Sequence, residues 1–229
     1  ICSAHKTLPA LGQSALLFTN GLDPRRVRQM TSVFGSSSPS YPMMISLDCA
    51  RDYLDGKGSE EYRRVARRTA ALRAAFPSLH EGELRLDPTR LTLTSPDGNA
   101  LAQALEGENI WPEMADSGHV VLILTAQDSE DDLHRLEEAL QRHRDLLGTP
   151  PILPPPPMPK SVRSLREALF APVERLPLEY CLGRVAAGQL APYPPGVPVV
   201  APGEVIGEKE LAYLREIGYN NSDVPVMCL

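Results

Sequence analysis

The sequence has no long apolar run, no closely spaced cysteine pair and no excess of positive charge. No segment reaches the roughly 18 consecutive apolar residues of a membrane-spanning helix. The net charge of −6 argues against nucleic acid or an anionic membrane as the main partner. The four cysteines lie far apart: Cys2, Cys49, Cys181 and Cys228. Their spacing favours free thiols over a disulfide framework, so we expect a reducing, cytoplasmic location.

The signatures of several enzyme classes are also missing. The sequence contains no Gly-x-Gly-x-x-Gly loop, no Walker A loop and no Gly-x-Ser-x-Gly elbow. His134 and His143 are nine residues apart rather than four, so they do not form a helical ligand pair. The segment "LHEGEL" lacks the second histidine of His-Glu-x-x-His. We interpret these histidines as surface residues and expect no metal site.

Arginines cluster between residues 63 and 73, where a phosphate-binding patch and a solvated helix face are the two alternatives. Glu60 precedes Arg64 by four positions, which is the spacing of a helical ion pair. Because the balance of charge elsewhere is acidic, the pattern favours the solvated helix face.

Hydrophobic spacing, caps and helix breakers predict alternating helices and strands. Asp23-Pro24 marks a helix start, and Pro77 ends a helix that begins at Ser59. The predicted helices span residues 24–34, 43–56, 59–76 and 95–105, followed by one with an apolar stripe of Leu133, Leu136, Leu140 and Leu147 and a last one ending at Gly218. The predicted strands span residues 13–20, 84–86, 91–94 and 119–125. The alternation over 85–147 indicates a small α/β layer domain.

The opening segment "SAHK" places Lys6 among small, mostly apolar residues. Burying an ammonium without a partner is costly, so such a lysine needs a reason. One reason is covalent chemistry, since desolvation and neighbouring cations make the neutral amine available. Ser3 and His5 would then bind the phosphate of a pyridoxal phosphate attached to Lys6. By themselves, however, the four residues fit an ordinary surface lysine better.

Three adjacent hydroxyls, Ser36, Ser37 and Ser38, precede Pro39. Such a run forms either a flexible turn or, together with its backbone N–H groups, a phosphate site. The residues alone do not decide between these two interpretations.

Three blocks occur in an order that is typical of one family. They are "SAHKTLPALGQSALL" (3–17), "SSSPSYPMMISLDCAR" (36–51) and "YPPGVPVVAPGE" (193–204). Each block adds independently to the match. Over essentially its whole length, the chain resembles the pyridoxal-phosphate-dependent ornithine/lysine/arginine decarboxylases of the aspartate-aminotransferase fold type.

The resemblance implies an α/β fold, in which the end of the large pyridoxal-phosphate-binding domain of fold type I is followed by a small α/β C-terminal domain. We expect the large domain to cover residues 1–58 and the small domain residues 59–148. A proline-rich connector (149–161) and a C-terminal helical and loop segment of the small domain (162–229) would follow. The chain is thus expected to be the C-terminal half of a longer enzyme. The other half would hold the acidic residue facing the pyridine nitrogen, the aromatic group stacked on the ring and the main phosphate loop.

The resemblance also implies roles for the residues of the first two blocks. In the family, a lysine holds pyridoxal 5'-phosphate covalently, and Lys6 matches it. Ser3 and His5 match residues that contact the cofactor phosphate. The triplet Ser36, Ser37 and Ser38 matches a loop that reaches the phosphate of the neighbouring subunit, which implies a homodimer or a higher oligomer. The implied reaction converts arginine, lysine or ornithine to carbon dioxide and an amine of polyamine metabolism.

The third block matches a loop near the substrate entrance. Its Gly196 allows a turn, while its prolines restrict φ. These prolines are Pro194, Pro195 and Pro198. Glu204 is either the carboxylate that binds the distal cation of the substrate or a structural carboxylate of the Pro-Gly-Glu turn, and both interpretations stay open.

One residue departs from the family pattern, and two alternative functions stay open. Many relatives have an acidic residue where this chain has Gly188, so the resemblance does not select among the three basic amino acids. Another fold type I reaction, such as aminotransfer, would release a keto acid instead of carbon dioxide. A non-catalytic subunit that binds a partner carrying the other half is the second alternative, although the intact Lys6 argues for retained cofactor binding. The 229-residue chain by itself is expected to be inactive.

Overall fold

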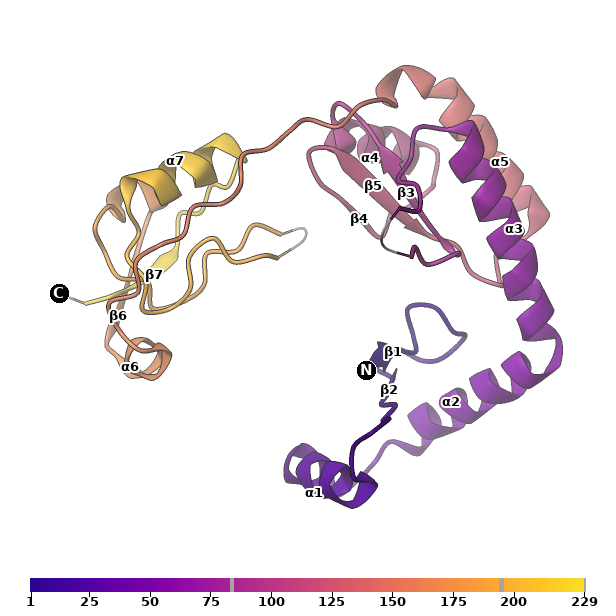
Figure 1. Cartoon of the computed structure of the whole chain (residues 1–229), viewed down its shortest axis with the longest axis horizontal. Coiled ribbons are helices and arrows are strands. Elements are labelled where there is room, and N and C mark those ends of the chain that lie inside the picture. The colour runs from indigo at the N-terminus through magenta and orange to yellow at the C-terminus, as the bar shows by residue number, and fades with distance from the viewer. Residues whose placement is uncertain (83–84, 194–195, 229) are drawn as a thin grey trace. The chain divides into compact units, whose positions relative to one another are not determined.

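A computed structural model describes residues 1–82, 85–193 and 196–228 (Figure 1). The chain forms two compact units, each with its own core. The first unit comprises Ile1–Thr94, Ala100–Glu113 and Val120–Gly148. The second unit comprises Ser95–Asn99, Met114–His119 and Thr149–Leu229. None of the helices described in these ranges is both long and apolar enough for a membrane span.

The first elements are two short strands and a capped helix. Strand β1 (Cys2–Ser3) pairs antiparallel with β2 (Ala15–Leu16). Helix α1 (Pro24–Phe34) starts where expected, because the Asp23 carboxylate accepts the N–H of Arg25 at 2.9 Å. The predicted strand over 13–20 was too long. Beyond β2 the side chains of Leu17 and Phe18 are exposed, because the two residues of β1 offer no longer strand to pair with.

A glycine-containing turn joins the next two helices. Helix α2 (Tyr41–Tyr53) runs through a π-helical turn (Leu54–Gly58) into α3 (Ser59–Ala75). Gly56 leaves helical geometry at φ −92° and ψ −126°, which confirms the predicted break. Gly58 lies against the Tyr53 ring so closely that a Cβ there would approach it to 2.5 Å. The end of α3 before Pro77 is also confirmed.

A three-stranded sheet with two helices follows. The strand order is β3 (Arg90–Thr94), β5 (His119–Ile123) and β4 (Met114–Ala115). Alternate residues of β3 and β5 are buried, as a half-buried strand requires: Leu91, Leu93, Val120 and Leu122. Helix α4 (Gly98–Gly107) and helix α5 (Glu130–Arg142) complete this part. The strand predictions for 91–94 and 119–125 are therefore confirmed within two residues.

Three details of this region differ from the predictions. Arg85 and Leu86 are not in a strand, because Asp87 turns the chain by accepting the N–H of Thr89 at 2.9 Å, and Leu84 lies outside the described residues. Helix α4 starts at Gly98 rather than Ser95. Leu147 is buried but lies beyond α5, after a short 3₁₀ turn (Arg144–Leu146).

The C-terminal part combines short helices with a strand pair. Residues 149–160 contain neither helix nor strand, in line with their prolines. Helix α6 (Leu165–Phe170), a 3₁₀ turn (Leu178–Tyr180) and helix α7 (Glu208–Glu216) follow. Strand β6 (Val173–Leu176) pairs antiparallel with β7 (Val224–Met227). The prediction missed this pair because each strand is four residues long and Pro225 interrupts the apolar pattern of β7.

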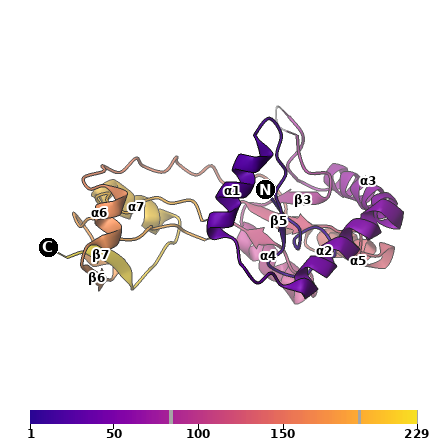
Figure 2. The same cartoon turned by 90° about the horizontal axis from the view of Figure 1, so that it is seen from below.

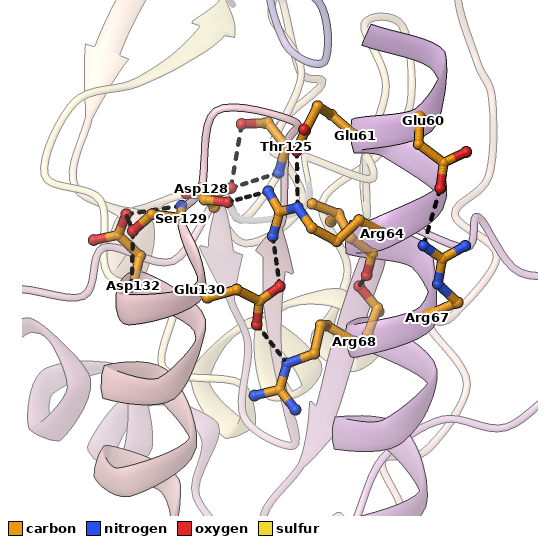
Figure 3. Close-up of polar contacts among 12 residues, drawn as sticks. Glu60, Glu61, Arg64, Arg67, Arg68, Thr125, Asp128, Ser129, Glu130 and Asp132 are labelled. Carbon is orange, nitrogen blue, oxygen red and sulfur yellow. Dashed lines mark hydrogen bonds and ion pairs between the residues drawn. The ribbon is translucent and has the colours of Figure 1, made fainter. Parts of the chain in front are cut away.

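Helices α3 and α5 run side by side and are joined by ion pairs (Figures 1–3). Arg64 of α3 donates to Glu61 at 2.8 Å, to Glu130 of α5 at 2.9 Å and to the Asp128 carbonyl oxygen at 2.7 Å. Only 24% of the Arg64 side chain is exposed. The predicted Glu60–Arg64 pair is therefore wrong, since Glu60 pairs with Arg63 and Arg67 instead. The side chains of Arg63 and Arg67 are each 66% exposed, as a solvated face requires, whereas Arg64 faces α5.

Replacing Arg64 with alanine should lower the free energy of unfolding by about 1–2 kcal/mol, because its charge-assisted hydrogen bonds to α5 are lost. Arg63→Ala is the matched control. The Arg63 side chain is 66% exposed and pairs with Glu60 on the same helix. This substitution should therefore lower the free energy of unfolding by less than about 0.5 kcal/mol. Urea unfolding of both variants measures the difference, and equal losses would contradict the role of Arg64.

Candidate functional site

Lys6 lies in a loop that is closed by its own hydrogen bonds. Ala4 is buried, its N–H donates to the Ser14 carbonyl oxygen at 3.0 Å, and its own carbonyl oxygen accepts the N–H of Leu8 at 2.8 Å. Ser14 is also buried, and its hydroxyl donates to the Leu11 carbonyl oxygen at 2.8 Å. The backbone around Lys6 is therefore fixed on both sides.

Helices α2 and α3 hold this loop from outside. The Tyr62 hydroxyl of α3 donates to the Thr7 carbonyl oxygen. Burial raises the pKa of the Tyr62 phenol, so it stays a protonated donor. On α2, the Ser46 hydroxyl oxygen accepts the N–H of Leu11 at 3.2 Å. The residue after Lys6 and the far arm of the loop are thus each tied to a helix.

The amine of Lys6 is not buried. Its side chain is 49% exposed, and its Nζ donates to the Glu113 Oε1 at 2.5 Å. This exposure agrees with the surface lysine that the four residues favour by themselves, and a carboxylate from another part of the first unit pairs with it. Sequence reasoning missed Glu113, which lies 107 positions away. No local spacing links the two residues, so a contact between them was not visible in the sequence.

Ser3 and His5 both precede Lys6, Ser3 by three positions and His5 by one. Ser3 is exposed at the end of β1, opposite Ala15. The His5 Nδ1 lies 2.9 Å from the Ser14 carbonyl oxygen. A carbonyl oxygen only accepts, so Nδ1 carries the proton and Nε2 is the other hydrogen-bonding atom of the ring. Nε2 can donate to an anion only when the imidazole is doubly protonated.

These donors fit the cofactor that the sequence suggests. An accessible primary amine suits covalent attachment to an aldehyde, and a hydroxyl with an imidazole suits a phosphate. Ser3, His5 and Lys6 supply all three groups on one exposed stretch of the chain. In the described ranges, no group of three histidine, cysteine or acidic side chains is arranged for a metal ion.

The serine triplet forms a turn of its own between α1 and α2. Ser36, Ser37 and Ser38 are exposed, and the Ser36 hydroxyl oxygen accepts the N–H of Ser38 at 3.1 Å. Among the described residues, no hydrogen bond or ion pair connects the triplet to Lys6. The chain itself therefore does not bring the two predicted phosphate-binding groups together, and the cross-subunit role of the triplet stays a prediction.

Glu204 belongs to the second unit, whereas Lys6 belongs to the first. The Glu204 Oε2 accepts the N–H of Ala201 at 2.7 Å and closes the turn through Gly203. Gly203 has φ +92°, and a Cβ there would approach the Arg163 carbonyl oxygen to 2.4 Å. Glu204 thus has a structural contact that occupies one carboxylate oxygen.

The structure explains two glycines in the second unit, Gly196 of the 193–204 block and Gly188 before it. Gly196 has φ +87°, which confirms the predicted turn, while Pro194 and Pro195 lie outside the described residues. At Gly188, a Cβ would approach the Pro225 Cγ of β7 to 2.6 Å. An acidic side chain therefore has no room at this position.

Sequence profiles of two domains match the chain. The profile described as Orn/Lys/Arg decarboxylase, major domain, matches residues 1–94. The profile described as Orn/Lys/Arg decarboxylase, C-terminal domain, matches residues 155–226.

Curated relatives match nearly the whole chain. The uncharacterized protein YaaO of Bacillus subtilis (strain 168) is 30% identical over 94% of this chain and 49% of its own length. The arginine decarboxylase of the same strain is 30% identical over 93% of this chain and 48% of its own length. The chain thus spans about half the length of the curated relatives it matches.

The fold agrees with these matches. The crystal structure of the Francisella novicida lysine decarboxylase LdcF superposes with a TM-score of 0.75 at 17% identity, covering 99% of this chain and 48% of that one. This likeness confirms the expected α/β fold, with the end of a fold type I large domain followed by a small C-terminal domain. Because both domain profiles match and the fold agrees with them, the chain belongs to the Orn/Lys/Arg decarboxylase family.

Proposed function

We propose that this chain is the lysine-bearing half of a pyridoxal-phosphate-dependent decarboxylase of basic amino acids. The observation that carries the proposal is the accessible Lys6 amine beside Ser3 and His5, in a chain of this family. The products would be carbon dioxide and an amine of polyamine metabolism, made in the cytoplasm. Among the three substrates we favour arginine, because the arginine decarboxylase of Bacillus subtilis matches 93% of the chain, whereas the inducible lysine decarboxylase of Escherichia coli matches 37%.

Each residue of the Lys6 loop has its own role in the proposed reaction. When bound, pyridoxal phosphate would supply an electron sink for the pair released as carbon dioxide leaves. Lys6 would attach the cofactor through its amine and, once free, would carry a proton beside the reacting carbon. The Ser3 hydroxyl and the His5 imidazole would hold the phosphate. Tyr62 and Ala4 hold the backbone of the loop that carries these groups.

The active enzyme needs further protein around residues 1–58. Helix α1 has no buried residue, and the Phe34 side chain at its end is 93% exposed. An isolated helix of eleven residues is marginal in water, so we propose that further protein of the fold covers it. The large-domain boundary at residue 58, the small domain over 59–148, the connector over 149–161 and the last segment over 162–229 belong to the same proposal.

Glu204 has two roles in this proposal. Its Oε2 closes the Ala201–Glu204 turn, and its second oxygen would bind the distal cation of the substrate. A carboxylate already fixed by one backbone N–H needs little further ordering to bind a guanidinium or an ammonium.

Lys6 should carry the cofactor in the complete enzyme, because its amine is accessible and flanked by phosphate-binding groups. Borohydride reduction followed by peptide mapping should place the pyridoxyl label on Lys6. A label on Lys57, Lys160 or Lys209 instead would refute the assignment.

Measuring agmatine, cadaverine, putrescine and keto acid among the products identifies the substrate and separates decarboxylation from aminotransfer.

The purified 229-residue chain should show no amino-acid decarboxylation, because the family resemblance places the groups that protonate and stack on the cofactor ring in the other half. Release of labelled carbon dioxide from arginine, lysine or ornithine measures this. Activity of the chain alone at a rate comparable to that of the complete enzyme would overturn the proposal that the other half is required.

The serine triplet should act on the cofactor of the neighbouring subunit. Replacing Ser36, Ser37 and Ser38 with alanine in the complete enzyme should weaken cofactor affinity, because hydroxyl donors to a dianion are lost. Mixing this variant with Lys6→Ala provides the sharper test. If the triplet acts across the dimer, each mixed dimer has one site with both defects and one intact site, so activity returns. Subunit exchange without recovered activity would show that the triplet serves its own chain.

A further inference from the structure

We propose that Glu113 is the positioning residue that holds the Lys6 ammonium whenever the lysine is not attached to the cofactor. The inference rests on the proposed function of Lys6 and adds a residue that the sequence did not suggest. Its basis is the 2.5 Å contact between the Lys6 Nζ and the Glu113 Oε1. A contact of this length between an ammonium and a carboxylate is a charge-assisted hydrogen bond.

Both ends of this ion pair are anchored by backbone contacts. The Glu113 N–H donates to the Val121 carbonyl oxygen of β5 at 2.9 Å, which fixes the segment just before β4. The Lys6 loop is fixed by the Ala4–Ser14 hydrogen bond and by the Tyr62 hydroxyl. The carboxylate is therefore presented to the amine by the sheet of the first unit, and the side-chain exposures of 49% and 34% leave room for a ligand to approach.

The pair has a defined place in the reaction. A lysine of this kind is free before the cofactor arrives and again while the substrate occupies the cofactor. In both periods Glu113 would keep the amine, as an ammonium, close to the reacting atoms. To attach, the ammonium must leave the carboxylate and give one proton to solvent. Its nitrogen then forms a bond to the aldehyde carbon, and the aldehyde oxygen leaves as water. Glu113 thus stabilises the free lysine in competition with attachment.

The test compares Glu113→Gln with Glu113→Asp and Glu106→Gln in the complete protein. Glu106 is an exposed carboxylate of α4, so its variant removes the same charge away from Lys6. The cofactor-free proteins are treated with trinitrobenzenesulfonate, and peptide mass mapping follows modification of Lys6 against the exposed Lys209. Glu113→Gln should speed the modification of Lys6 about two- to fivefold, the range expected for a half-exposed ion pair. Glu113→Asp and Glu106→Gln should stay near the wild-type rate.

Two further measurements test the Lys6–Glu113 ion pair independently of the variants' modification rates. In the wild-type protein, raising sodium chloride to about 0.5 M should speed the modification of Lys6 relative to Lys209, because salt screens a half-exposed pair. Glu113→Gln should also bind pyridoxal phosphate about two- to fivefold more tightly, since a competing state is lost. Unchanged Lys6 reactivity in both the variant and high salt would overturn the role of Glu113, even if the cofactor labels Lys6. A cofactor label elsewhere would refute the proposed function instead, while the reactivity of Lys6 would still test the ion pair.

Discussion

The hydrogen bond from the Tyr62 hydroxyl to the Thr7 carbonyl oxygen connects the Lys6 loop to α3 and so to the rest of the first unit. Tyr62 lies on α3, the same helix whose Arg64 pairs with α5. One helix therefore holds the lysine loop at one point and the layer of α5 at another. Because Tyr62 and Arg64 lie two positions apart on α3, the contact with the Thr7 carbonyl oxygen and the contact with α5 come from the same turn of one helix.

Much of the helical structure could be predicted because its signals are local. The Asp23 cap, the α3 stop before Pro77 and the apolar stripe of α5 each depend on residues within one or two turns. The start of α5 is a similar case, since Ser129 and Asp132 cap it reciprocally, and the Ser129 hydroxyl lowers the pKa of the Asp132 carboxyl. The pair β6 and β7 could not be predicted in this way, because pairing partners such as Val173 and Met227 are far apart in the chain.

The candidate site shows the same division. Lys6, Ser3 and His5 are adjacent in sequence, so a motif could identify them, and the resemblance supplied a function for them. The contacts around these three residues could not be identified from the motif. The residues around Lys6 favoured a surface lysine, which its 49% exposed side chain matches, but they gave no sign of its ion-pair partner. The carboxylate of Glu113 reaches Lys6 only because the sheet and the loop are held in one unit.

An exposed and paired lysine suits covalent catalysis better than a buried one. Burial without a partner would favour the neutral amine, but it would also close the path by which cofactor and substrate arrive. A half-exposed ion pair costs little to break, since such pairs contribute only about 0.2–1 kcal/mol. In the proposed reaction, Glu113 would therefore keep Lys6 in place and still release it in every cycle. The backbone of the loop is held through Ala4 and Tyr62, while the Lys6 side chain would move between the carboxylate and the proposed cofactor.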